Sequence, residues 1–448
     1  MTPAPDQALL LWTAAAVVAL ILLIAWARLN AFVALTVTSL VVGAVSGMPL
    51  GTVVRAFQEG VGSTLGFIAV VIGLGTMVGK MLAESGGADV VADRLIRLFG
   101  VRHVHWTIAL VAFVVGLPVF FSVGLVLVAP IVFTLARRER LPLLLVGLPL
   151  VAGLSASHGL VPPHPGPLAA IERLHADMGG TIVWSLAIGL PAALIVGPPL
   201  GWFVGQRLAV APGALATELS AREEGRPRPG FGVTLFAILL PIVLMLGATA
   251  AAVVWPDGGR LRAAAEFAGS PIVAMTLAVL VSFHVFGLAC GLDRKAILRF
   301  SEECLGPVAS VLLVVGAGGG FGRVLDAAGV GTALHDVASG LRLSPLLLGW
   351  VIAALLRIAV GSATVAIVTA AGIMAPVAAA MPGTNRELLV LALGAGSIVA
   401  SHVNDGGFWL VKEYFNLTVV QTLATWTVLE TAFSIVALCL VLAASLVI

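Results

Sequence analysis

The sequence predicts an all-α polytopic membrane protein with two inverted repeats, each of about five transmembrane helices plus a re-entrant hairpin and a broken helix. Composition, the succession of apolar segments and matching strings in the two halves support this fold class. Of 448 residues, 60% are hydrophobic and 10% are charged, whereas a soluble domain has roughly 25% charged residues. Segments of the ~20 apolar residues that span a bilayer recur from residue 8 to 448.

The remaining composition excludes several classes of site. The stretch MTPAPDQ has neither a basic region nor a small-residue cleavage site, so residues 8–27 are expected to be a retained span rather than a signal peptide. Cys290, Cys304 and Cys439 show no metal or redox spacing, so no disulfide framework or cysteine-based metal site is predicted. A net charge of +2 gives no indication of a nucleic-acid partner.

Twelve apolar segments lie six on each side of one polar linker. They divide the chain into a first transmembrane repeat (1–206), a cytoplasmic linker (207–230) and a second, inverted transmembrane repeat (231–448). Three strings of the first half recur in order and at nearly constant spacing in the second, which indicates an internal duplication. The pairs are GKMLAESGG (79–87) with GRVLDAAGV (322–330), GLPVFFSVGLVLVAP (116–130) with GSATVAIVTAAGIMAP (361–376), and SHG (157–159) with SHV (401–403).

The fourth and fifth segments of each half are expected to be irregular. Residues 104–137 and 345–381 are long for one span and short for two, with central Gly, Pro, Ser or Thr. A re-entrant hairpin fits that length, and its tip would line a cavity or be buried in protein. The fifth segments are interrupted at 155–167 and 401–407. Such paired breaks indicate a transporter's binding site, and helix N-termini there suit an anionic substrate.

Five spans and one hairpin per half make the second repeat inverted, with both termini outside. Basic residues support this topology, because cytoplasmic loops are enriched in Lys and Arg. The inner side would collect 15 basic residues: Arg28, Arg94, Arg97, Arg102, Arg137, Arg138, Arg140, Arg207, Arg222, Arg226, Arg228, Arg294, Lys295, Arg299 and Lys412. The outer side would collect 7: Arg55, Arg173, Arg260, Arg262, Arg323, Arg342 and Arg386.

Two polar strings at the predicted breaks offer binding groups. In GSAT (361–364), Ser362, Thr364 and free backbone N–H groups could bind a carboxylate or sugar hydroxyls, or the string could be a small-residue helix contact. In SHVNDGGFWLVKEY (401–414), a charge at membrane depth is costly. Asp405 is therefore a candidate proton-coupling residue, and His402 and Asn404 are candidate substrate donors. The alternative is an interfacial helix cap by Asn404 or Asp405.

Other polar residues at membrane depth have weaker assignments. His158 flanks the first break and is a candidate for substrate or proton binding, or for packing, whereas His164 is expected to belong to the loop structure. Arg357 could pair with a substrate carboxylate or form a structural ion pair with Glu430, and the ion pair is the preferred interpretation. The glycine string GAGGGFG (316–322) lacks a βαβ context for dinucleotide binding and indicates helix packing or close substrate approach.

The chain resembles the gluconate permease family of gluconate:proton symporters, within the ion transporter superfamily. The resemblance covers residues 59–438 through EGVGSTLG, SASHGLVPPHPGPLAA, ADMGGTI, RIAVGSATVA, SHVNDGGFWLVKEY and QTLATWTVLETAFSIVAL. It implies uptake of gluconate or a related sugar acid with protons across a bacterial inner membrane. It also implies a multi-pass homodimer, elevator-like motion and no cofactor beyond protons. His158, Ser362, Thr364, His402, Asn404 and Asp405 would lie near the substrate.

Two positions depart from the pattern of that family. Ser122, a further candidate substrate-binding residue, stands where the resemblance implies an acidic residue, and Gly406 stands where Ser is usual. Asp405 is then the expected proton carrier, with His158 or His402 as alternatives. The competing functions are transport of another small hydroxy acid or an amino acid such as D-serine, an intramembrane enzyme, and a channel. The chain has no serine or metal constellation that supports an enzyme, and duplicated broken elements favour alternating access over a channel.

The inverted topology places the linker in the cytoplasm. In a background without the native cysteines, a single cysteine near Arg226 should resist an impermeant thiol reagent applied to intact cells, because the reagent cannot reach the inner face. The measurement is the extent of labelling before and after permeabilisation. Ready labelling of intact cells would contradict the inverted arrangement.

Overall fold

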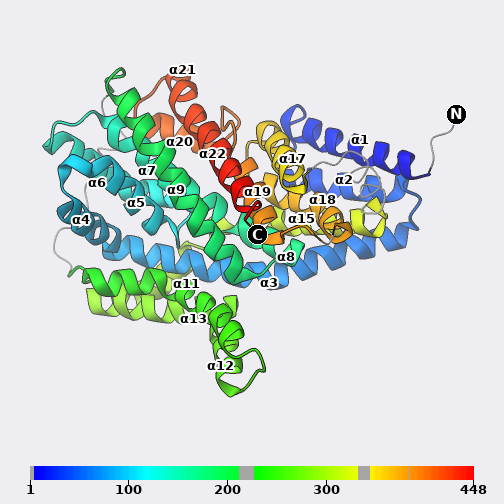
Figure 1. Cartoon of the computed structure of the whole chain (residues 1–448), viewed down its shortest axis with the longest axis horizontal. Helices are drawn as coiled ribbons and strands as arrows, with labels where there is room; N and C mark the ends of the chain where they lie inside the picture. The colour runs from blue at the N-terminus through cyan, green and yellow to red at the C-terminus, as the bar shows by residue number, and fades with distance from the viewer. Residues whose placement is uncertain (1–4, 211–226, 331–343, 382, 448) are drawn as a thin grey trace.

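The computed structural model describes residues 5–210, 227–330, 344–381 and 383–447, and every regular element in these ranges is a helix (Figure 1). Most of the predicted linker at 207–230, including Arg222 and Arg226, lies outside the described residues. The division of the chain into two repeats with a cytoplasmic linker therefore stays a prediction.

The helices of the first half are α1 (Pro5–Ala25), α2 (Ala31–Val45), α3 (Leu50–Ser85), α4 (Gly87–Phe99), α5 (Val104–Gly116), α6 (Phe121–Arg138), α7 (Leu143–Leu160), α8 (Pro165–Leu174) and α9 (Met178–Gly205). Those of the second half are α11 (Phe231–Val254), α12 (Arg260–Gly269), α13 (Pro271–Ser282), α14 (Arg294–Glu303), α15 (Ala309–Ala327), α17 (Pro345–Val360), α18 (Ala363–Ala380), α19 (Arg386–Gly396), α20 (Gly406–Tyr414), α21 (Val419–Thr422) and α22 (Val428–Ala444).

Nine helical segments of the described residues are long and apolar enough to cross a membrane, or ten when the bent pair α4–α5 counts as one span. The predicted all-α polytopic membrane class is thereby confirmed. The number is below the twelve apolar segments because the apolar parts of α1 and α2 are shorter helices. The eleventh segment is also split into α19 and α20, which have 11 and 9 residues. The inversion of the second half stays a prediction.

The four predicted interruptions are present in the backbone. Residues 117–120 separate α5 from α6, and 361–362 separate α17 from α18. The fifth segments break at 161–164 and at 397–405. In the break at 361–362, Gly361 has φ +80°, a left-handed conformation that glycine adopts without steric cost. The local chemistry of the chain therefore determines where the helices stop.

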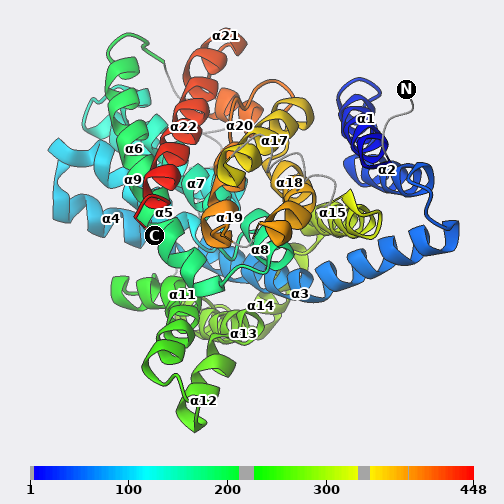
Figure 2. The same cartoon turned by 45° about the vertical axis from the view of Figure 1, so that its right-hand side comes forward.

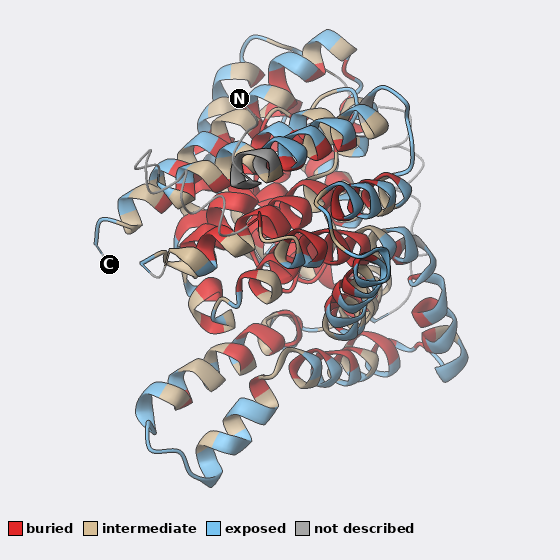
Figure 3. Cartoon of the chain, turned by 90° about the vertical axis from the view of Figure 1, so that its right-hand side faces the viewer, coloured by how far each residue is buried: buried red, intermediate tan, exposed pale blue. Residues whose placement is uncertain are grey.

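The broken span α7–α8 forms the interior of the molecule. In its most apolar window 89% of residues are buried inside the protein, against 28% for α3. Figure 2 shows α8, α18 and α19 near the centre, with α1 and α2 at the far end of α3 and α11–α13 below it. Buried residues concentrate in the middle of the molecule and exposed ones on its peripheral helices (Figure 3). The break at 161–164 is therefore buried in protein, as irregular backbone at membrane depth requires.

The two halves interlock rather than forming separate units. Helix α3 packs on α15, α8 on α18, and α9 on α22. Arg173 of α8 forms an ion pair with Asp326 of α15 at 2.6 Å. The backbone N–H of Asp177 donates to Glu387 at 2.9 Å. The core is thus built jointly by both halves.

The glycine string at 316–322 is a helix-packing surface, one of its two expected roles. A Cβ on Gly60 of α3 would lie 2.4 Å from the Gly319 carbonyl oxygen, and one on Gly320 would lie 2.6 Å from the Phe57 ring. Such distances are shorter than van der Waals contact, so the backbones of α3 and α15 pack directly against each other at these glycines. Long apolar helices gain much of their association in lipid from such packing.

Gly60→Ala should destabilise the protein. The added methyl group must displace the α15 backbone, and overpacking typically costs 1–3 kcal/mol, which exceeds the ~1 kcal/mol that Ala gains over Gly in a helix. The measurement is the thermal unfolding midpoint in detergent. Gly62→Ala is the matched control, because a Cβ there meets nothing within 4 Å. Equal midpoints for the two variants would show that the close approach of α3 and α15 does not limit stability.

Candidate functional site

A cavity of about 1700 Å³ reaches from the molecular surface to the helix breaks. Its floor consists of residues of both halves: Ser122, Ser155, His158, Arg357, Ser362, Thr364, Asn404, Asp405, Gly406 and Glu430. Arg357 and Glu430 are each 3% exposed. Its mouth carries exposed charges, and the Arg138 side chain is 81% exposed. The volume exceeds the ≈300–1,000 Å³ of a typical small-ligand pocket. It therefore combines a polar floor with a wide vestibule.

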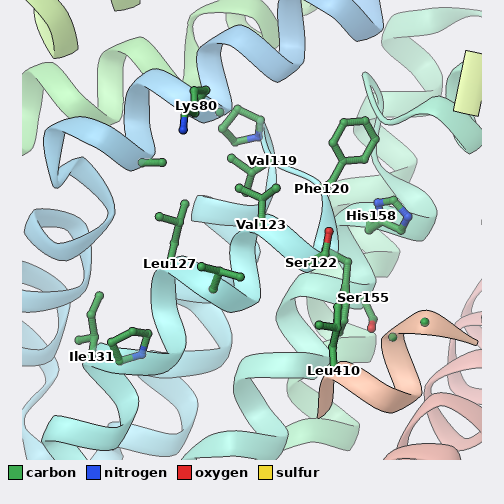
Figure 4. A pocket seen from close by; sticks show the side chains of 18 of the residues that line it. Lys80, Val119, Phe120, Ser122, Val123, Leu127, Ile131, Ser155, His158 and Leu410 are labelled. Atoms are coloured by element: carbon green, nitrogen blue, oxygen red, sulfur yellow. The ribbon is translucent and has the colours of Figure 1, made fainter. Parts of the chain in front are cut away.

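One wall of the vestibule is the apolar face of α6. Val123, Leu127 and Ile131 follow one another at four-residue spacing and point into the cavity (Figure 4). Lys80 of α3 lies across from them, paired with Glu84 at 2.9 Å. Ser122, Ser155 and His158 gather at the inner end (Figure 4). A polar solute would thus pass an apolar wall before reaching the hydrogen-bonding floor.

Three helix N-termini line the cavity. They are those of α6 at Phe121–Val123, of α18 at Ser362–Thr364 and of α20 at Asp405–Gly407. The first N–H groups of a helix have no intrahelical acceptor, and the aligned peptide dipoles place partial positive charge there. The Ser362 side chain accepts from the Val365 N–H, whereas the Thr364 hydroxyl has no hydrogen bond within the described residues. This arrangement can bind an anion.

Arg357 forms an ion pair with Asp405, and the expected pairing of Arg357 with Glu430 is corrected. One guanidinium nitrogen contacts Asp405 Oδ2 and another donates to the Gly361 carbonyl. Asp405 also accepts from the Ser401 hydroxyl and, at 2.9 Å, from the Gly407 N–H. The pairing changes because the loop before α20 places Asp405 directly against the C-terminal end of α17. The helix-cap interpretation of Asp405 describes its geometry.

His402 and Asn404 bind the end of α17. The Asn404 amide donates to the Ile358 carbonyl at 2.9 Å, and the His402 ring lies 3.0 Å from the same oxygen. These contacts satisfy carbonyls that a helix C-terminus leaves free. Asn404 lines the cavity, whereas His402 is not among the lining residues. His402 therefore has an observed structural partner and no access to the floor.

The first half repeats this type of contact. His164, as expected of a loop-structure residue, lies 2.9 Å through Nε2 from the carbonyl of Gly116, the last residue of α5. His158 packs against His164 with ring centroids 5.1 Å apart. It lines the cavity, and its buried Nδ1 has no hydrogen-bond partner. Of the two histidines, His158 is thus available to a substrate.

Glu430 of α22 lines the floor and is buried. Its Oε1 has no hydrogen-bond partner. Ser155 of α7 also lines the floor and interacts with the Glu430 carboxyl group.

The structure brings together eight of the predicted site residues and leaves His402 outside the cavity. The eight are Ser122, His158, Arg357, Ser362, Thr364, Asn404, Asp405 and Glu430. Sequence reasoning missed Ser155, although its signal was available. Ser155 precedes His158 by three residues, which places both on one face of α7.

The fold and the cavity define a multi-pass membrane transport protein. The GntP family permease pattern matches residues 8–447, and the chain belongs to this family. The chain is 50% identical to the gluconate permease of Pseudomonas aeruginosa over 99% of this chain and 98% of the relative. It is 42% identical to the high-affinity gluconate transporter of Escherichia coli, over 95% of this chain and 97% of that protein.

Two further similarities bear on specificity and on fold. The D-serine transporter DsdX of Escherichia coli is 39% identical over 94% of this chain and 95% of the relative. The crystal structure of the Alcanivorax borkumensis YdaH transporter matches with a TM-score of 0.65 and 18% identity, covering 93% of this chain and 97% of that one. The relatives are permeases and transporters, so the chain is a transport protein rather than an enzyme.

Asp405→Asn should destabilise the protein by about 3–5 kcal/mol, because it leaves buried Arg357 without its counter-ion. Asparagine also caps helices, so loss of the α20 cap contributes little. The measurement is the free energy of unfolding in detergent. Glu413→Gln is the control, since its pair with Lys412 is exposed and such pairs contribute ~0–1 kcal/mol. If both variants lost equally little stability, the Arg357–Asp405 pair would have no structural role.

Proposed function

We propose that this permease takes up gluconate or a related sugar acid together with protons. The observation that carries the proposal is the convergence of three helix N-termini on the floor of one cavity, beside Arg357. That floor offers partial positive charge and N–H donors to a carboxylate. The gluconate transporters among the relatives, at 50% and 42% identity, favour this substrate class.

The hydroxyl-bearing groups of the floor fit a polyhydroxylated chain. Ser122, Ser155 and Thr364 each have a hydroxyl that can donate and accept, and the Asn404 amide faces the same cavity. A site built to hydrogen-bond substrate hydroxyls discriminates strongly against analogues that lack them. The carboxylate would lie at the helix N-termini, and the hydroxyls would extend toward α7.

The orientation of the cavity supports an inward-facing state. Its mouth carries Arg97, Arg138 and Arg228, which the distribution of basic residues assigns to the cytoplasmic side. In the proposed cycle the floor faces the periplasmic side of a bacterial inner membrane to load. It then moves to this state in an elevator-type transition of a homodimer. Helix breaks contributed by both halves to one floor support alternating access.

The second candidate is transport of a small hydroxy or amino acid. It is favoured by the 39% identity to a D-serine transporter and by Glu430 on the floor, whose ionised form could bind an ammonium group. A binding panel on the purified protein decides between the candidates. Thermal stabilisation by D-gluconate and L-idonate, without an effect of D-serine or L-serine, is expected. The reverse pattern would refute sugar-acid transport.

Thr364→Val should weaken gluconate binding about 2- to 13-fold. This corresponds to roughly 0.5–1.5 kcal/mol for one net hydrogen bond, because the hydroxyl is lost while the shape is kept. The measurement is the gluconate dissociation constant by titration calorimetry. Thr369→Val is the matched control on α18, since Thr369 is buried and is not a cavity-lining residue. Unchanged affinity in Thr364→Val would assign this N-terminus to helix packing.

A further inference from the structure

The buried carboxyl group of Glu430 has no counter-ion of its own. Arg357, the cation that the sequence assigned to it, pairs with Asp405. Glu430 is 3% exposed, its Oε1 is without a hydrogen-bond partner, and it lines the cavity floor. An isolated ionised carboxylate costs far more free energy to bury than a protonated one. The site therefore suits a group that gains and loses a proton.

Few charged groups face Glu430. Arg357 of α17 and Asp405 before α20 interact with it and offset each other as a pair. Of α7, Ser155 contacts its carboxyl group and His158 shares the floor. Helix α9, which packs on α22, contains no titratable residue between Met178 and Gly205. Helix α19 has its charges, Arg386 and Glu387, at its first turn. The charge on the floor is thus governed by Glu430 itself.

We propose that Glu430 is the proton-binding residue that couples protons to the anionic substrate, an inference that rests on the proposed function. Asp405 is less available for this role, because its carboxyl group is already bound by Arg357, the Ser401 hydroxyl and the Gly407 N–H. With Arg357 and Asp405 neutral as a pair, an ionised Glu430 repels the substrate carboxylate. A protonated Glu430 does not. Proton and anion therefore bind together, one of each.

The same electrostatics determine the transport cycle. The proton enters from the loading side, neutralises Glu430 and permits the anion to bind. The proton and the anion together add no net charge to the floor, so the co-transport step is electroneutral. On the cytoplasmic side the proton leaves to water in the vestibule. The ionised carboxylate then repels the anion and promotes its release, so the anion is not carried without a proton.

The test counts protons on purified protein in weakly buffered detergent solution with D-gluconate as the probe. In the pH range in which free Glu430 is ionised, wild type should take up one proton per gluconate bound, and its dissociation constant should rise about tenfold per pH unit. Glu430→Gln, which resembles the protonated form, should take up none and bind with a pH-independent affinity. Glu430→Asp should restore proton uptake. Glu59→Gln is the control, because Glu59 is exposed, outside the cavity and paired with Arg323.

The outcomes separate this inference from the proposed function. Proton uptake by Glu430→Gln equal to that of wild type would overturn the inference and place the proton on Asp405 or His158. Gluconate binding by wild type with a pH-independent affinity and without proton uptake at any pH of the titration would overturn both the inference and symport. If wild type does not bind gluconate, the proposed substrate is wrong. Proton uptake is then counted with the anion of the binding panel that does bind, and that result decides the role of Glu430. In proteoliposomes, Glu430→Gln should retain gluconate counterflow but lose accumulation driven by a pH gradient.

Discussion

The ion pair between Arg357 and Asp405 is the constraint on which the geometry of the floor depends. Arg357 is in the last turn of α17 and Asp405 is the N-cap residue of α20, so their contact fixes one helix break against another. Ser401 extends the pair to the π-helical turn Leu423–Thr427 that precedes α22, because it donates to Asp405 and accepts from the Trp426 indole N–H at 2.7 Å. Desolvating two charges is unfavourable unless further hydrogen bonds satisfy them. The observed network supplies such bonds and holds three segments in register.

A helix break inside a membrane protein leaves N–H and carbonyl groups without intrahelical partners. They can bind a ligand, but they are costly to bury if nothing binds them. The free N–H groups at the starts of α6, α18 and α20 face the cavity, where a polar ligand or water can bind them. The opposite helix ends need other partners. His164 contacts the last carbonyl of α5, and Asn404 donates to the carbonyl of Ile358 in α17. Polar side chains of each half thus bind carbonyl ends, and Ser362 and Asp405 each accept from one N–H group at the starts of α18 and α20.

The prediction from sequence succeeded where local chemistry determines the backbone. The low fraction of charged residues and the recurring apolar segments identified the membrane class, and clusters of Gly with Pro, Ser or Thr located the breaks that the structure has near Val161 and at Gly361. It failed for pairings that depend on three-dimensional distance. Arg357 and Glu430 are both isolated charges in apolar segments, so pairing them was reasonable. The nearer partner, Asp405, is revealed by the course of the 397–405 loop, which no periodicity encodes. For the same reason the sequence could not show that His158 lines the cavity whereas His402, its counterpart in the second half, does not.

Ser122 and Gly406, where the resemblance implies an acidic residue and a serine, can be interpreted from this geometry. Ser122 is in the first turn of α6, where a carboxylate would neutralise the helix dipole and repel an incoming anion. With serine there, the partial positive charge of α6 remains available to the substrate. Gly406 is in the first turn of α20, and a Cβ there would meet open space, so glycine widens the floor without relieving any clash. Serine at 122 leaves the site less negative, glycine at 406 leaves it roomier, and Glu430 is the floor carboxyl group without a counter-ion of its own. The fewer acids the floor contains, the more completely the protonation of that one group determines when an anion can bind.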